Sequence, residues 1–108
     1  MIIELGKLLN EVQTRTITTD KGDKAVLNNR IAIYQGKNKT TFIDITAWGF
    51  TAEFIEKYFK KGDEIFVEGE LKNKSVTIED KTFQNCFILI RNVRNVYGKN
   101  PRPVEQEV

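Results

Sequence analysis

A run of alternating side chains from Thr41 to Gly49 restricts the possible folds of this chain more than any other segment. Successive side chains along a strand point to opposite faces of a sheet. Two sets therefore separate, with Ile43, Ile45 and Ala47 on one face and Phe42, Asp44, Thr46 and Trp48 on the other. The first set is typical of a core face. The second combines aromatic rings with a carboxylate and a hydroxyl, which suits flat ligands with polar edges, such as unpaired nucleobases.

Strand patterns also dominate the rest of the chain. Four further segments are predicted to be strands: Ile2 to Leu9, Ala25 to Tyr34, Glu64 to Leu71 and Phe83 to Val96. Gly6 marks a point where the first of them can bulge or bend. In the third, Ile65, Val67 and Leu71 share the apolar face. Residues 72–81 resemble one arm of a hairpin, and residues 19–23 a turn.

A single helix is predicted after Gly49, from Thr51 to Lys60. Apolar residues recur there at helical spacing, namely Ala52, Ile55 and Phe59. We expect Thr51 to cap its start, Glu53 to lie in its first turn and Gly62 to end it. Three strands, a helix and two strands are the order of a five-stranded barrel, and the fold class is therefore predicted to be all-β.

Length and composition predict one domain without metal or cofactor. The chain has 108 residues, of which 40% are hydrophobic, enough for one core. We expect this domain over residues 1–97 and a short flexible tail over residues 98–108. The sequence has no histidine and one cysteine, so the usual structural zinc sites lack ligands. Cys86 lies in an apolar stretch, where we expect it to pack as a small buried side chain.

Neither a secretory signal nor a membrane span is recognisable in the sequence. The first residues lack a basic start followed by a long apolar stretch, and no segment approaches roughly 18 apolar residues. We therefore expect a cytoplasmic protein with no membrane partner. The net charge of +2 is too mild to indicate a nucleic-acid ligand by itself. Such a ligand has to be argued from the arrangement of residues.

The segment from Asp44 to Leu71 resembles the central block of the bacterial single-stranded-DNA-binding protein family. That block joins an aromatic-Gly strand end, a Thr-Ala-Glu helix, a Tyr-[Leu/Phe]-x-Lys-Gly stop and a Val-Glu-Gly-x-Leu strand. This chain carries them as Trp48-Gly49, Thr51-Ala-Glu53, Tyr58-Phe-Lys-Lys-Gly62 and Val67-Glu-Gly-Glu-Leu71. Weaker matches extend outward to Leu5-Gly-Lys-Leu8, Arg15 and Ala25-Val26.

The resemblance implies an OB-fold, a five-stranded partly open Greek-key barrel with one short helix between strands 3 and 4. It also implies coating of single-stranded DNA without sequence preference in replication, recombination and repair, normally as a homotetramer.

Departures from the family pattern modify this expectation. Asn29 stands where the family usually has a core phenylalanine. Val76 replaces a tryptophan that some relatives use for stacking, so we expect the hairpin arm to bind by charge more than by ring. The chain ends at Val108 without the glycine-rich linker and acidic Pro-Phe tip of housekeeping members. We therefore do not expect recruitment of proteins through an acidic tail, and interpret the chain as a phage, plasmid or other mobile-element version.

Aromatic stacking and phosphate contacts are the two predicted components of DNA binding. Phe42 and Trp48 are the leading stacking candidates, with Tyr34 as a third, although these rings could instead pack against a neighbouring subunit or the hairpin arm. The predicted cationic contacts come from seven side chains: Arg30, Lys37, Lys39, Lys72, Lys74, Lys7 and Arg15. Any single lysine among them could equally belong to a solvated face.

The first strand and one phenylalanine are predicted to hold subunits together. Phe66 lies among glutamates, where a polyanion would be repelled, so we assign it to a contact between subunits. An edge strand can pair with its copy, which adds Ile2, Ile3, Glu4 and Leu5 to this interface. The resemblance favours a tetramer over a dimer.

Two other functions remain open at this point. Asp44 with Glu53, or Glu79 with Asp80, could form the carboxylate pair of a metal nuclease, but acidic residues in turns are far more often solvated turn formers. The sequence has no nucleophile elbow and no glycine-rich phosphate loop, so we expect neither enzyme activity nor a small-molecule substrate. The alternative within the binding class is an OB-fold primosomal or adaptor protein that mainly contacts other replication proteins.

Overall fold

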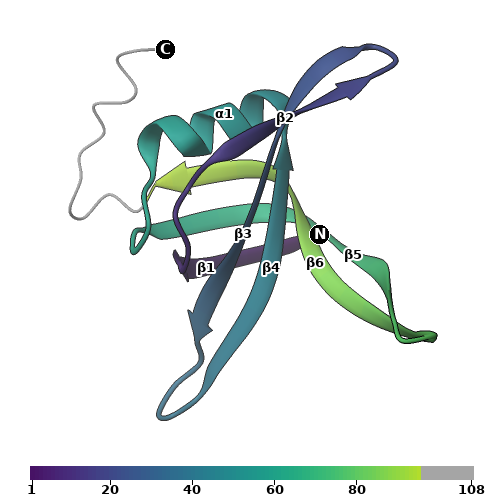
Figure 1. Ribbon diagram of the computed structural model, residues 1–108. Coiled ribbons are helices and arrows are strands. Elements are labelled where there is room, and N and C mark those ends of the chain that lie inside the picture. Colours follow the sequence, from purple (N-terminus) through teal and green to yellow (C-terminus); the bar gives the residue numbers. More distant parts are fainter. Residues whose placement is uncertain (96–108) are drawn as a thin grey trace.

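The strands of the computed structural model wind into a closed sheet, and one helix lies across an end of it (Figure 1). The structure describes residues 1–95, so the expected domain end at residue 97 and the tail over residues 98–108 lie outside the described residues. The elements are, in chain order, β1 (Ile2–Leu8), β2 (Thr14–Thr19), β3 (Gly22–Tyr34), β4 (Thr40–Trp48), α1 (Gly49–Tyr58), β5 (Glu64–Ile78) and β6 (Lys81–Asn95).

The pairing of the strands closes the sheet into a barrel. Neighbours follow the order β1-β5-β6-β4-β3-β2, and β1 also pairs with β3 where Lys7 lies opposite Ala32 and Leu8 opposite Ile31. β4 and β6 run parallel, whereas the other pairs are antiparallel. Because β1 and β2 both pair along β3, they count as one interrupted strand of the barrel. The helix then follows the third of five strands, and the predicted OB-fold is confirmed.

β2, the second part of this interrupted strand, was not predicted from the sequence, and Asn29 provides a physical reason for the interruption between β1 and β2. This side chain is buried, with 6% of its surface exposed. Its Oδ1 accepts hydrogen bonds from the backbone N–H groups of Asn10 at 3.2 Å and Arg30 at 2.7 Å, and its Nδ2 donates to the carbonyl oxygens of Asn10 at 3.2 Å and Glu11 at 3.4 Å. A buried amide requires such partners. The segment between β1 and β2 supplies them, and it therefore leaves the sheet.

The core lies inside the barrel and beneath the helix. Its fully buried side chains are aliphatic and come from every wall: Leu8, Leu27, Ile31, Ile45, Ile55, Ile65, Val67 and Ile88. Each contributes roughly 1.5–3 kcal/mol by leaving water. From α1, Ala52 and Ile55 are buried against this core, and the helix packs on β3, β4 and β6. Within the described chain, no helix has the length and apolar character needed to cross a membrane.

The helix begins and ends two residues earlier than predicted. Gly49 has a φ of 59°, which lets the chain turn from β4 directly into α1. Thr51 therefore lies inside the helix rather than at its cap, and the first turn contains no acidic residue. After the helix, Gly62 has a φ of 91° and its N–H donates to the carbonyl oxygen of Leu8 at 2.9 Å. Gly62 thus acts after the helix has ended, by joining this turn to β1.

The predictions that Leu71 belongs to the apolar core face and that Cys86 is buried are wrong. Leu71 is 51% exposed, and the exposed Cys86 has its Sγ 3.4 Å from Oδ1 of Asn73. β1 pairs with β5 no further than Gly69, and β4 pairs with β6 no nearer its start than Phe87. Beyond these points β5 and β6 form a two-stranded arm outside the barrel. No opposite wall covers its side chains there, within the described residues.

Candidate nucleic-acid interface

The outer face of β4 presents both leading aromatic rings to solvent. Phe42 is 56% exposed and Trp48 is 43% exposed, whereas Ile45 and Ala47 between them point into the core with no exposed surface. Tyr34, on the paired strand β3, is 63% exposed. The two rings of β4 are six positions apart, which places them about 20 Å from one another along the strand. Rings at this spacing are available to different bases of one extended strand.

The predicted cations Lys7 and Arg15 lie in register with these rings. Residues directly opposite one another in neighbouring strands share a face of the sheet. Two such rows cross the barrel, with Lys7, Ala32 and Phe42 in one and Arg15, Val26 and Trp48 in the other. Each cation is therefore two strands, about 10 Å, from a ring. Ala32 and Val26, in the middle of the two rows, are 1% and 2% exposed, so neighbouring side chains cover them.

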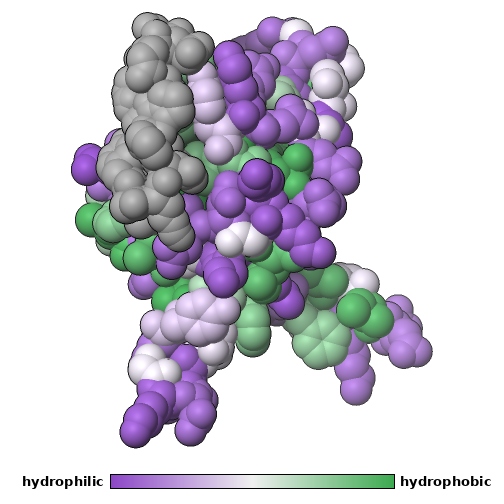
Figure 2. All heavy atoms as spheres, turned by 90° about the vertical axis from the view of Figure 1, so that its left-hand side faces the viewer, coloured by the Kyte–Doolittle hydropathy of each residue, from purple (hydrophilic) through white to green (hydrophobic). Residues whose placement is uncertain are grey.

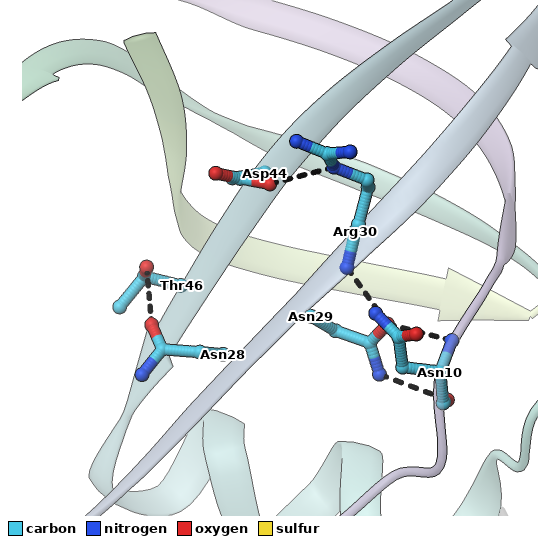
Figure 3. Close-up of polar contacts among 6 residues, drawn as sticks. All are labelled: Asn10, Asn28, Asn29, Arg30, Asp44 and Thr46. Atoms are coloured by element: carbon cyan, nitrogen blue, oxygen red, sulfur yellow. Dashed lines mark hydrogen bonds and ion pairs between the residues drawn. The ribbon is translucent and has the colours of Figure 1, made fainter. Parts of the chain in front are cut away.

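Polar side chains fill the face between the two rows (Figure 3). Arg30 Nε donates to Asp44 Oδ1 at 2.9 Å, and Thr46 Oγ1 donates to Asn28 Oδ1 at 2.8 Å. The side chains of Arg30 and Asp44 remain 52% and 40% exposed. Arg30 thus lies on the predicted surface, but in an ion pair that partly neutralises it.

A hollow of about 530 Å³ opens beside this ion pair. Its walls come from β3, β4, the segment after β1, and the base of the β5–β6 arm, and they include Asn10, Asn28, Arg30, Asp44, Lys74 and Phe87. Phe87 lies directly beside Asp44 in the parallel pairing of β4 and β6. The hollow therefore combines an aromatic ring, amides and charges of both signs.

The two predicted lysines of the arm have different surroundings. Lys74 lines the hollow. Lys72 Nζ lies 3.3 Å from Glu70 Oε1, and Arg91 approaches the same oxygen at 3.5 Å. Hydrogen bonds from Lys72 and then Arg91 hold the pKa of the Glu70 carboxyl below its ordinary value. Lys72 is thus already paired, whereas Lys74 adjoins the candidate interface directly.

Lys37 and Lys39 occupy the tip of the β3–β4 hairpin. Both are exposed, and the hairpin extends away from the barrel (Figure 1). Two arms protrude together on one side of the molecule in Figure 2, one with a hydrophilic tip and the other carrying hydrophobic side chains. On the β5–β6 arm, Ile78 is 56% exposed and Phe83 is 49% exposed.

Sequence reasoning missed the aromatic side chains of this arm. Phe83 lies directly opposite Val76, the position at which some family members have a tryptophan. The arm therefore carries this ring on β6 rather than on β5. Phe83 and Phe87 share one face of β6 by simple alternation, which was a readable signal. Their cross-strand partners were not readable, because the turn at Glu79 and Asp80 uses positive φ angles of 49° and 67° that favour Asn-Gly rather than two acidic residues. Phe50 at 77% exposure, at the start of α1, was also missed.

The residues predicted to join subunits divide between two faces of the sheet. Ile3 at 53% exposure, Leu5 at 42% and the half-buried Phe66 point outward, and Phe66 lies opposite Leu5. Ile2 packs against the core of its own barrel, and Glu4 alternates with the outward residues. Apart from Lys7 and Leu8, the second edge of β1 has no strand partner among residues 1–95. We call Ile3, Leu5 and Phe66 the outer apolar patch.

The acidic residues considered for a metal nuclease do not form a cluster. Asp44 accepts a hydrogen bond from Arg30, and Glu53 is exposed on α1. Glu79 and Asp80 form the turn of the β5–β6 arm. In the part of the chain that the structure describes, there is no group of three or more side chains suited to hold a metal ion.

Comparison with known proteins identifies one family. Residues 1–96 match the model of the single-strand binding protein family. A single-stranded DNA-binding protein of Malacoplasma penetrans is 38% identical over 101 residues, covering 89% of this chain and 51% of the relative. One from Clostridium acetobutylicum is 31% identical over 75 residues, 66% of this chain and 68% of the relative. One from Streptococcus agalactiae serotype III is 24% identical over 108 residues, 97% of this chain and 82% of the relative. The chain thus spans about half the length of the first of these relatives.

Proposed function

Since the chain belongs to the single-strand binding protein family, we propose that it binds and coats single-stranded DNA with little regard to sequence. The observation that carries the proposal is the joint exposure of Phe42 and Trp48 on one face of β4. A base stacked on an aromatic ring contributes about 1–3 kcal/mol whatever its identity, because every base has a π face. Two such rings on a rigid strand give affinity without reading sequence.

Phosphate contacts supply the second component of the proposed binding. Lys7 lies in the same cross-strand row as Phe42, and Arg15 in the same row as Trp48. Lys74 lines the hollow beside Asp44. Lys37, Lys39 and Lys72 extend the cationic surface along the two protruding hairpins. A strand lying on the rings would pass within reach of these side chains, and each phosphate contact would release condensed counterions.

The proposal includes a cellular role and an assembly. We assign the chain to replication, recombination and repair, where single-stranded DNA is exposed, and with that role goes a cytoplasmic location. We further propose a homotetramer, with the outer apolar patch and the second edge of β1 as its contact surfaces. Exposed apolar side chains support this assignment, since they lie beside a strand edge that, apart from Lys7 and Leu8, has no partner among residues 1–95.

Fluorescence titration tests the proposal directly, because Trp48 is the single tryptophan of the chain. Adding oligo-dT should quench its emission to saturation at a fixed ratio of nucleotides to protein. The oligonucleotide should remain intact during incubation with Mg²⁺. Unchanged emission together with no binding by anisotropy would refute the proposal, and cleavage of the oligonucleotide would instead favour the nuclease interpretation.

A further inference from the structure

A carboxylate in the middle of the proposed DNA-binding face requires an explanation. Asp44 lies between the rows that carry Phe42 and Trp48, and 40% of its side chain is exposed. A phosphate placed there would be repelled, so this part of the face does not suit the DNA backbone. A base edge that carries N–H donors would be attracted instead.

The hollow beside Asp44 has unused hydrogen-bonding capacity. Asp44 Oδ1 accepts from Arg30 Nε, and among residues 1–95 its Oδ2 has no hydrogen-bond partner (Figure 3). Within the same described range, the terminal nitrogens of Arg30 and the Nδ2 of Asn28 also make no hydrogen bond. The ion pair places the carboxylate beside the guanidinium. The wall thus presents acceptors and donors next to one another.

The size and lining of the hollow suit a nucleobase. Its volume of about 530 Å³ lies within the range of small-ligand pockets, roughly 300–1,000 Å³. The half-buried Phe87 lies beside Asp44 and offers an aromatic surface at the same wall. Lys74, on the arm, adds a cation at the rim that can neutralise the phosphate of the same nucleotide.

We propose that this hollow binds a guanine base of the single strand, an inference that rests on the proposed function. Guanine carries two adjacent donor groups, N1–H and N2–H₂, which match the oxygens of Asp44, and its O6 acceptor matches the donors of Arg30. Thymine has a single N–H between two carbonyl oxygens, which would face the carboxylate unfavourably. Each protomer would therefore bind any sequence but hold a guanine most tightly at this position.

Competition between oligonucleotides that differ at one base tests the inference. Three probes are needed, namely oligo-dT and the same strand with one central guanine or one central hypoxanthine, all in lithium buffer to prevent quadruplexes. Wild-type protein should bind the guanine probe at least about fivefold more tightly than oligo-dT. Hypoxanthine, a purine without the N2 amino group, should fall between them. Equal affinity for guanine and thymine, or for guanine and hypoxanthine, would overturn the inference.

A pair of matched variants assigns the effect to Asp44. Asp44→Asn keeps the shape of the side chain but removes its charge, and should reduce the preference for guanine to within about twofold of thymine while oligo-dT still binds. Asp20→Asn, on the exposed turn between β2 and β3, should keep the wild-type preference. A guanine preference that survives in Asp44→Asn would overturn the inference and leave general binding intact. Failure of the wild type to bind any probe would refute the proposed function, and this inference with it.

Discussion

At the scale of single residues, rings and cations contribute to DNA binding in physically different ways. Stacking on Phe42 or Trp48 displaces water from an aromatic face and involves no counterion. A lysine that contacts a phosphate releases condensed cations, and its contribution therefore falls as salt rises. The two kinds of residue can be separated by measuring affinity at several salt concentrations.

Removing one ring should weaken binding without changing its salt dependence. We predict that Phe42→Ala and Trp48→Ala each cost about 1–3 kcal/mol of binding free energy for single-stranded DNA. The slope of log affinity against log salt should stay at the wild-type value, because no phosphate contact is lost. Anisotropy of a labelled oligo-dT measures both quantities and does not depend on Trp48 itself. A slope that falls in either variant would show that the ring acts by positioning a cation.

Removing Lys74 should have the opposite signature. Lys74→Ala should lower the magnitude of the salt slope by about 0.7 and weaken binding to all sequences alike. Lys72 in the same strand is the matched control. Its ammonium is already 3.3 Å from Glu70, so Lys72→Ala should change the slope less. Equal slope changes in the two variants would contradict the different roles that their surroundings indicate.

At the scale of strands and helices, local alternation predicted most of the barrel. The core faces of β3 and β4 follow directly from the period of two, and the helical spacing of Ala52, Ile55 and Phe59 placed one helix among the strands. Two features depend on contacts between segments and could not be read from one segment alone. Asn29 binds the backbone of Asn10, 19 residues away, and breaks the first strand.

The second such feature is the close packing of β5 on β6. Gly69 is needed there because a Cβ atom at this position would overlap the carbonyl oxygen of Leu89. The register also shifts between Glu68 and Gly69, opposite Asn92 and Ile90, which leaves Arg91 as an extra residue of β6. The alternation of side chains along β3 and β4 predicted which of their residues belong to the candidate site, just as it predicted their core faces. The residues that β6 adds to the site, including Phe87, could not be predicted, because the register between β4 and β6 is set only in the folded barrel.

An aromatic ring on either strand of the β5–β6 arm should be able to stack on a base. Phe83→Ala is predicted to weaken single-strand binding by about 1–3 kcal/mol, because it removes the exposed ring of the arm. Val76 lies directly opposite and shares its face, so Val76→Phe in the Phe83→Ala background should restore most of the loss. Anisotropy with oligo-dT measures both changes. A double variant no better than Phe83→Ala would show that the strand carrying the ring matters, and not only the face.

At the scale of the whole molecule, the stacking rings of the proposed DNA face and the outer apolar patch lie on different walls of the barrel. The rings belong to β4, whereas Ile3 and Leu5 belong to β1 and Phe66 to β5. Subunits can therefore join through the patch without covering the rings. Linked protomers bind one strand with higher avidity than a free protomer, because each further contact becomes intramolecular.

Assembly through the patch should be sensitive to a charge placed within it. Leu5→Glu buries a carboxylate if the patch is an interface, so we predict that light scattering changes from a tetramer for the wild type to smaller species. Leu71→Glu is the matched control, since Leu71 is 51% exposed and lies outside the patch, and it should leave the mass unchanged. The dissociated variant should still quench Trp48 on a short oligo-dT while its affinity for a long strand falls toward that of the short one. A Leu5→Glu protein with wild-type mass would place the subunit contact elsewhere, and one that fails to quench with short DNA would show that the binding face itself needs the assembly.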